Sequence, residues 1–206
     1  MQGTQTAIPP TPSGPPATST AELDTEPGQA RPPKNWTRRP GHRVMIRVAR
    51  ANDLAAISDF FAGLSLRSRY QRFFAPVMPS QALLRRLTGA VGCADVLVAV
   101  RHGAIIGHAM AADASSSGGP GTTEIGLVVA DQWQGRGVGA ALLRTLISRA
   151  QSRGASTVVM DVLPANKLVL GMIGRRWPDA AKEVCADFIT VRAQLREGGR
   201  RLLAAS

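Results

Sequence analysis

Cysteine and histidine are scarce in this chain of 206 residues, which limits the metal and redox chemistry that it can support. It has two cysteines, Cys93 and Cys185, and three histidines, His42, His102 and His108. None of them stands in a CxxC or a Cys/His metal-ligand spacing. The sequence therefore predicts neither a metal site nor a disulfide framework, and a reducing cytoplasm is the expected compartment.

Long apolar runs are missing as well. The N-terminus does not have the basic and then apolar segment of a secretory signal peptide, and no apolar run reaches membrane-spanning length. We therefore expect a soluble cytoplasmic protein that does not enter a membrane. The hydrophobic fraction of 44% is still that of a globular chain with a buried core.

Lysine is rare among the cations. Lys34, Lys167 and Lys182 are the only lysines, and arginines supply the rest of a formal net charge of +11. Such a charge suits an anionic partner, such as a polyphosphate cofactor, a nucleic acid or an acidic protein. A GC-rich genome that encodes arginine wherever a solvated cation is tolerated is the alternative explanation. Nucleic acid is not the expected partner, because interleaved exposed aromatics and a recognisable binding motif are both missing.

The first 43 residues differ in composition from the rest of the chain. They hold nine of the fourteen prolines and almost no large apolar side chains. Such a segment cannot bury enough apolar surface to offset the entropy of ordering it, so we expect 1–43 to be a disordered Pro-rich tail. The folded domain is expected over 44–195, and 196–206 is expected to be a basic C-terminal tail.

Hydrophobic periodicity predicts alternating strands and helices over 44–195. Strands are expected at 44–49, 95–100, 105–112, 123–130, 157–161, 181–184 and 188–194. Helices are expected at 54–64, 67–74, 80–88, 137–153 and 166–175, with a flexible Ser/Gly-rich loop at 113–122. Asn52 and Asp53 are expected to cap the first helix. The resulting order, β-α-α-α-β-β-β-α-β-α-β-β, predicts the α/β class with a mixed sheet.

The most informative segment is a glycine-rich loop. The stretch Gln134-Gly-Arg-Gly137-Val-Gly139 follows an apolar strand and opens a helix. Glycines leave backbone N–H groups accessible at the positive end of the helix dipole, which is where phosphates bind. The loop therefore predicts a phosphate cradle.

Two other kinds of phosphate-binding loop fit this pattern less well. A Walker A loop ends in Gly-Lys-Ser/Thr, which is missing here. A Rossmann fingerprint fits Gly135 to Ala140, with Asp161 at the distance of a ribose-binding carboxylate. Against it, Asp131 to Gln134 separate the strand from the loop, and the roughly 45 residues after Asp161 are too few for several more βα units.

The loop and its surroundings resemble the acyl-CoA-binding motif Q/R-x-x-G-x-G/A of the GNAT superfamily of N-acetyltransferases. A strand precedes the loop, an amphipathic helix and a strand follow it, and Leu163-Pro-Ala-Asn166 opens another helix. The resemblance covers about 44–195 and implies the GNAT fold, a mixed central β-sheet flanked by helices. It also implies acetyl-CoA as the acyl donor, without a metal, and an amine as the acceptor.

The resemblance also assigns a cofactor site. The strand end at Val128 and Val129 would bind the pantetheine arm through its backbone, and the loop amides would hold the pyrophosphate. The loop residues are Gln134, Gly135, Arg136, Gly137, Val138 and Gly139. Asn166 matches an asparagine that commonly meets the pantetheine, with a plain helix N-cap as the alternative.

Glu124 is the candidate catalytic base. An amine must be neutral to attack a thioester, and a lysine side chain has an ordinary pKa of about 10.4. Glu124 shares a strand face with Gly126 and Val128, at a point where GNAT enzymes place their proposed base; a strand glutamate without a role is the alternative. The tyrosine that protonates the leaving thiolate in many relatives is replaced by Ile173, and the only tyrosine is Tyr70.

Two further segments bear on the family. Residues 64–74 resemble the second helix of bacterial Pat-type protein lysine acetyltransferases, in which Ser-x-Tyr-x-Arg-Phe-Phe recurs. The alternative explanation of this segment is that two of its three aromatics, Tyr70, Phe73 and Phe74, are simply core residues. Arg176-Trp177 replaces the usual Gly-Phe after the last helix. The sequence thus predicts an N-acetyltransferase acting on a protein lysine or a small amine by direct attack. A catalytically silent acyl-CoA-binding module is the alternative.

Overall fold

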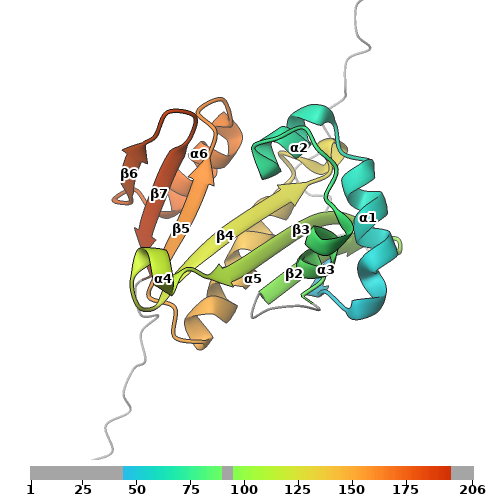
Figure 1. Ribbon diagram of the computed structural model, residues 1–206, viewed down its shortest axis with the longest axis horizontal. Coiled ribbons are helices and arrows are strands. Elements are labelled where there is room, and N and C mark those ends of the chain that lie inside the picture. Colours follow the sequence, from blue (N-terminus) through green and yellow to red (C-terminus); the bar gives the residue numbers. More distant parts are fainter. Residues whose placement is uncertain (1–43, 90–94, 196–206) are drawn as a thin grey trace, which may run out of the picture. The chain divides into compact units, whose positions relative to one another are not determined.

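A computed structural model describes residues 44–89 and 95–195 (Figure 1). A seven-stranded sheet runs through this part of the chain in the order β1-β2-β3-β4-β5-β7-β6. Its strands are β1 (Met45–Val48), β2 (Asp95–Arg101), β3 (Ala104–Asp113), β4 (Thr122–Val129), β5 (Thr157–Val162), β6 (Ala181–Val184) and β7 (Ile189–Gln194). The helices are α1 (Leu54–Ala62), α2 (Leu66–Phe73), α3 (Gln81–Leu87), α4 (Ser115–Gly118), α5 (Val138–Ser152) and α6 (Lys167–Arg176). The predicted tails, 1–43 and 196–206, lie outside the described residues.

The predicted α/β class with a mixed sheet is confirmed. Neighbouring strands pair antiparallel, except that β4 and β5 pair parallel. The expected order of elements recurs with one difference, because the short helix α4 forms inside the loop predicted at 113–122. The carboxylate of Asp113 accepts hydrogen bonds from the backbone N–H and the hydroxyl of Ser115, which orders this turn.

The strands β4 and β5 pair over three residues and then diverge. Their register joins 122–124 to 157–159. Beyond Glu124, β4 continues to Val129 with β3 as its partner, whereas β5 continues to Val162 with β7. Figure 1 shows the two strands running apart toward α2 and α6. Within the described residues, one edge of β4 therefore has no strand partner between Ile125 and Val129.

Hydrophobic clusters cover both faces of the sheet. The helix α5 packs on one face through the six apolar residues that its periodicity predicts: Val138, Leu142, Leu143, Leu146, Ile147 and Ala150. The helices α1 and α3 pack on the other face, where they enclose Val128. Because β4 sends Ile125 and Val129 to the α5 face and Val128 to the other, the alternation expected of this strand is confirmed. None of the helices that the structure describes is long and apolar enough to cross a membrane.

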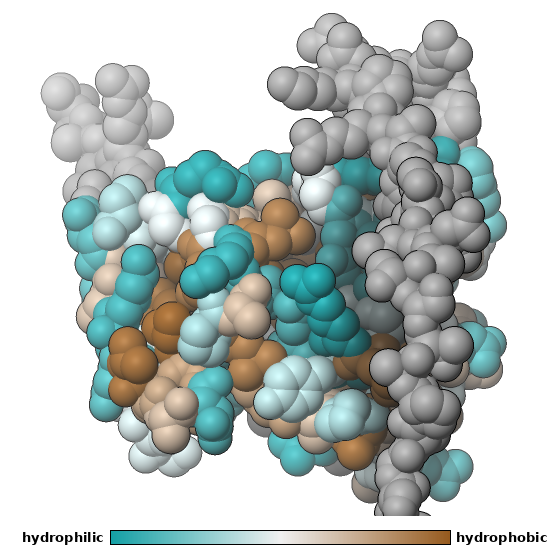
Figure 2. All heavy atoms as spheres, turned by 90° about the horizontal axis from the view of Figure 1, so that it is seen from above, coloured by the Kyte–Doolittle hydropathy of each residue, from teal (hydrophilic) through white to brown (hydrophobic). Residues whose placement is uncertain are grey.

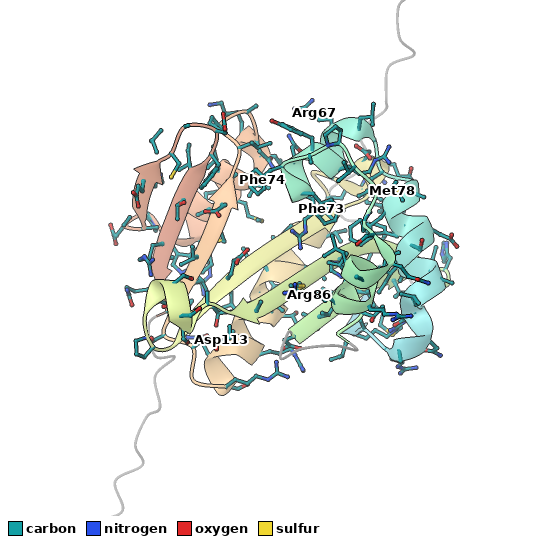
Figure 3. The ribbon with its side chains drawn as sticks, in the orientation of Figure 1. Arg67, Phe73, Phe74, Met78, Arg86 and Asp113 are labelled. Atoms are coloured by element: carbon teal, nitrogen blue, oxygen red, sulfur yellow. The ribbon has the colours of Figure 1, made fainter. Side chains whose placement is uncertain are left out.

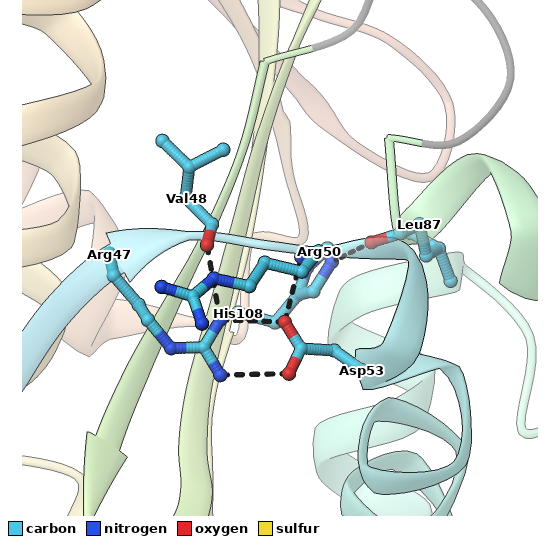
Figure 4. A network of polar contacts seen from close by, with 6 residues as sticks. All are labelled: Arg47, Val48, Arg50, Asp53, Leu87 and His108. Atoms are coloured by element: carbon cyan, nitrogen blue, oxygen red, sulfur yellow. Dashed lines mark hydrogen bonds and ion pairs between the residues drawn. The ribbon is translucent and has the colours of Figure 1, made fainter.

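The carboxylate of Asp53 has a different role from the predicted helix cap. It accepts two hydrogen bonds from the guanidinium of Arg47 in β1, at 2.6 and 2.8 Å, and one from the backbone N–H of Arg50 at 2.7 Å (Figure 4). A bidentate charged pair is a stronger interaction than a bond to a helix N–H, which is why Asp53 turns toward β1. Pairing with Arg47 holds the pKa of Asp53 below its ordinary value.

Candidate active site

A cleft of about 280 Å³ opens where β4 leaves β5. It is bounded by α2, the end of β4, the glycine-rich loop and α6. It brings together these residues predicted to bind the cofactor: Val128, Val129, Gln134, Gly135, Gly137, Gly139 and Asn166. The other two, although both are described, do not line it. Val138 lies in the core, and Arg136 stacks on Trp133 with its Cζ 4.9 Å from the ring centre.

The loop has the backbone conformation that its glycines permit. Gly135 and Gly137 have φ of 70° and 84°, in the left-handed region that side chains disfavour. An added Cβ would meet nothing within 4 Å at either position, so their requirement for glycine is conformational. Gly137 is the N-cap of α5, whose first N–H groups have no partner within the helix. The positive end of α5 therefore begins at the cleft, as a phosphate cradle requires.

Gln134 connects the loop to its neighbours. Its side-chain amide donates to the backbone carbonyl of Val129 at 3.0 Å and to the hydroxyl oxygen of Ser68 in α2 at 2.9 Å. The adjacent Asp131 accepts hydrogen bonds from the hydroxyls of Ser65 and Ser68, at 2.6 and 2.8 Å, and from the backbone N–H of Ser65. Partial burial raises the pKa of Asp131, but these hydrogen bonds outweigh burial and place it below its ordinary value.

A second hollow, of about 60 Å³, adjoins the cleft. The two hollows share six lining residues and therefore adjoin: Gln71, Arg72, Leu127, Asn166, Val169 and Met172. The carboxylates of Glu124 and Asp161 border this second hollow, and Asp161 also accepts a hydrogen bond from the Thr190 hydroxyl at 2.7 Å. The structure thus places the predicted base beside the cofactor cleft, at the point where the pairing of β4 with β5 ends.

The end of α2 carries aromatic residues with different roles. Phe73 packs on Phe61 of the core, with ring centres 5.3 Å apart. Phe74, in the left-handed conformation that ends α2, lies 5.7 Å from the ring of Phe188, which precedes β7 (Figure 3). Tyr70 and Phe74 are 44% and 39% exposed. The alternative that two of the three aromatics are core residues is therefore wrong, because the left-handed turn at Phe74 directs its side chain away from the core.

Residues of α6 and at its two ends bear on two of the expectations. The Asn166 side chain accepts a hydrogen bond from the Val169 N–H at 3.3 Å, so Asn166 caps the helix and also lines both hollows. Ile173, at the position of the family's tyrosine, is 1% exposed and lies in the core. Trp177 is buried there too, so the altered segment still supplies an aromatic residue to the core.

Sequence reasoning did not assign any role to Ser68, Gln71 or Arg72. The resemblance of 64–74 to a Pat-type helix indicated the right helix but not these side chains. The periodicity of α2 could not have identified them, because the surface that they face is formed by β4 and the loop. Among the described residues, no three His, Cys, Asp or Glu side chains come together as a metal site would need.

Residues 64–175, more than half of the chain, match the acetyltransferase (GNAT) family. The chain belongs to the GNAT acetyltransferase family. It is accordingly an N-acetyltransferase by family, and acetyl-CoA is the acyl donor of this family. The cleft lies between the glycine-rich loop and the free edge of β4.

Solved GNAT structures share the predicted fold. The GNAT domain of S. lividans PAT aligns with a TM-score of 0.66 and 24% identity, over 74% of this chain and 90% of that one. Ribosomal-protein-alanine N-acetyltransferase from Brucella melitensis aligns with a TM-score of 0.57 and 21% identity, over 73% and 98%. A phosphinothricin acetyltransferase from Sinorhizobium meliloti, solved in complex with acetyl-CoA, aligns with a TM-score of 0.58 and 20% identity, over 74% and 87%. No curated protein matches the chain.

Proposed function

We propose that this GNAT protein transfers the acetyl group of acetyl-CoA to the side-chain amine of a protein lysine by direct attack. The observation that carries the proposal is that two adjoining hollows share six lining residues beside the free edge of β4. One hollow begins at the glycine-rich loop, and Glu124 lines the other. A thioester that enters from the first can meet an amine that enters from the second.

The donor would lie along the loop and the end of β4. The pyrophosphate would accept hydrogen bonds from the loop amides at the N-terminus of α5, and the pantetheine would follow the backbone at Val128 and Val129. Leu127, Leu168 and Met172 supply an apolar lining for the arm. The resemblance of the loop to the family motif supports the same placement.

Glu124 would remove the proton from the attacking amine, directly or through water. The nitrogen lone pair forms a C–N bond to the thioester carbon, and the C–S bond breaks as the tetrahedral intermediate collapses. The bound ammonium first gives one proton to Glu124. The second proton, which the nitrogen loses as the amide forms, passes through solvent to the departing coenzyme A thiolate. Tyr70 lines neither hollow. A thiolate is a good enough leaving group to depart without a tyrosine acid.

Exposed apolar side chains near the site support a protein acceptor. They lie on α2, on the α2–α3 connection and on α6, and they are Leu66, Tyr70, Phe74, Val77, Met78 and Leu168. Figure 2, turned by 90° about the horizontal axis from Figure 1, shows apolar side chains at the surface among hydrophilic ones. Exposed apolar surface beside a catalytic hollow is typical of a macromolecular docking site, whereas a small amine needs none. The carboxylates of Glu124 and Asp161 would attract the cationic lysine.

The test combines acetyl-CoA titration with thiol release against lysine peptides and small amines. Glu124→Gln should lower kcat by about 10²–10⁴-fold, since a general base contributes that much, and should leave the acetyl-CoA affinity unchanged. Glu183→Gln is the matched control, because Glu183 is exposed on β6 and lines neither hollow.

Each result of this assay supports or excludes a different function or mechanism. Release of the coenzyme A thiol with lysine peptides supports the proposal. Release with a small amine alone shows that the acceptor is a small amine instead of a protein lysine. Turnover that is equal in wild type and Glu124→Gln removes Glu124 from the mechanism. Binding of acetyl-CoA without release by any amine identifies a silent acyl-CoA-binding module.

A further inference from the structure

The guanidinium of Arg72 occupies an unusual position on β4. If Gly126 carried a Cβ, that atom would lie 2.6 Å from Cζ and Nη2 of Arg72 and 2.7 Å from Nη1. The guanidinium therefore fills the space that a side chain at position 126 would take. The ring of Phe73 lies beside it, with Cζ 5.1 Å from the ring centre. Gly126 is needed here for space, since the guanidinium packs directly on the backbone of β4.

One nitrogen of this guanidinium lacks a hydrogen-bond partner. Its Nε is buried and has no hydrogen-bond partner in the part of the chain that the structure describes, and no ion pair of Arg72 is found there. Burial lowers the pKa of Arg72 to about 10, and the charge of Glu124 opposes that shift, so the side chain remains cationic at neutral pH. A buried N–H without a partner is costly, and a charged oxygen is the acceptor that best satisfies a guanidinium.

The position of Arg72 relative to the two hollows identifies that oxygen. The acetyl group must lie where the donor cleft meets the acceptor hollow, because the amine has to reach the thioester carbon. Six residues line both hollows, namely Gln71, Arg72, Leu127, Asn166, Val169 and Met172. Arg72 is the only one of the six with a charge. The negative oxygen that develops during attack therefore forms beside this cation.

We propose that Arg72 is a catalytic residue that donates a hydrogen bond to the thioester carbonyl oxygen and stabilises the oxyanion formed when the amine attacks. Attack turns the carbonyl C=O into a C–O⁻ single bond, and the guanidinium, which stays protonated, neutralises that charge. Collapse restores the C=O bond and expels the thiolate. Gly126 is a positioning residue, because its lack of a side chain lets the guanidinium reach the strand. The inference rests on the proposed acetyl transfer at this site.

The experiment that tests this role needs no acceptor. The full-length protein is bound to acetyl-CoA labelled with ¹³C at the carbonyl, and the carbonyl stretch is recorded by isotope-edited infrared difference spectroscopy. A hydrogen bond from a cation lowers this frequency. The frequency should therefore be lower in the wild type than in Arg72→Gln. Arg67→Gln, on the same helix but exposed and outside both hollows, should match the wild type (Figure 3).

A second variant tests the same contact without changing the arginine. Gly126→Ala should displace the flexible end of Arg72 and raise the carbonyl frequency as Arg72→Gln does, with the fold intact. Gly174→Ala in α6, where an added Cβ meets nothing within 4 Å, is its control. With a blocked lysine peptide as acceptor, Arg72→Gln should lower kcat by about 10²–10³-fold, the loss typical of an oxyanion donor. In the double variant, the effects of Arg72→Gln and Gly126→Ala on the carbonyl frequency and on kcat should not add.

The possible results separate this inference from the function on which it rests. If the wild type binds no acetyl-CoA, the proposed function fails. If it binds acetyl-CoA but its carbonyl frequency equals that of Arg72→Gln, the role of Arg72 is overturned. An unchanged frequency with weaker acetyl-CoA binding would show a cofactor contact instead, and an unchanged kcat with a raised KM for the peptide would show an acceptor anchor. Either of these results also overturns the inference.

Discussion

His108 illustrates how the surroundings of one residue set its charge. Its side chain is fully buried on β3, and Nε2 lies 2.8 Å from the backbone carbonyl of Leu87 (Figure 4). Because a carbonyl only accepts, Nε2 carries a hydrogen. Burial lowers the pKa of His108 to about 4; the bond to Leu87 opposes this shift and the charge of Arg72 adds to it. We therefore assign His108 a structural role under the α1–α3 layer.

The low pKa of His108 makes stability depend on pH. The unfolded chain binds this proton below about pH 6.5, whereas the folded chain binds it only near pH 4. The free energy of unfolding should therefore fall as the pH drops from 6.5 to 4, by roughly 3 kcal/mol from this residue. His108→Gln keeps a donor for the Leu87 carbonyl and removes the titration.

Urea unfolding at several pH values measures this effect. The variant should show a shallower decline between pH 6.5 and 4 than the wild type. An identical slope in His108→Gln and the wild type would show that His108 does not carry the pH dependence.

At the scale of elements, the position of α2 depends on a segment far away in sequence. Its N-cap, Ser65, and its buried Ser68 both donate hydrogen bonds to Asp131, and Ser68 also accepts one from Gln134. The same short stretch of chain thus holds the helix that carries Arg72 and the loop that forms the phosphate cradle. A change in this network should affect both walls of the donor cleft.

Asp131→Asn should weaken acetyl-CoA binding although Asp131 does not line the cleft. It replaces a charged acceptor of three hydrogen bonds by a neutral amide, a loss of about 1 kcal/mol and roughly a fivefold rise in Kd. Isothermal titration measures the change. Asp59→Asn, at an exposed site on α1, is the matched control. An unchanged Kd in Asp131→Asn would show that the loop holds its shape without α2.

At the scale of the whole sheet, the strands form two groups joined at one place. The group β1–β4 and the group β5–β7 meet through the three residue pairs of β4 with β5. The proposed donor cleft, the proposed acceptor hollow and the free edge of β4 lie at or beyond this junction. The position of the proposed active site thus depends on how far the two strands pair, rather than on any one motif.

Hydrogen exchange should detect the occupation of this edge. Acetyl-CoA should slow exchange in peptides that cover 125–129 and 134–140, because the donor would bond to backbone groups that no strand pairs. A peptide that covers β2 should not change, since β2 is paired on both sides. Mass spectrometry of the full chain with and without acetyl-CoA measures this. Equal slowing over the whole domain, or none in 125–140, would contradict the predicted placement of the donor.

Local patterns predicted much of this molecule. The order of elements, the six core residues of α5 and the place of the glycine-rich loop at the start of α5 all follow from periodicity and backbone preference, which act within a few residues. The exceptions were small: a short helix in the loop after β3, and the pairing of Asp53 with Arg47 in place of a helix cap. The disordered tails remain predictions because they lie outside the described residues.

The sequence by itself determined the family, the glycine-rich loop and the candidate base Glu124, because each is written in adjacent residues or in a strand's alternation. Only the tertiary structure decided which side chains meet at the junction of the two hollows. The packing of Arg72 on Gly126, and the ties from Gln134 and Asp131 to Ser68, join residues more than fifty positions apart. Such contacts depend on how far β4 and β5 pair and on where α2 then lies, and no local preference encodes either.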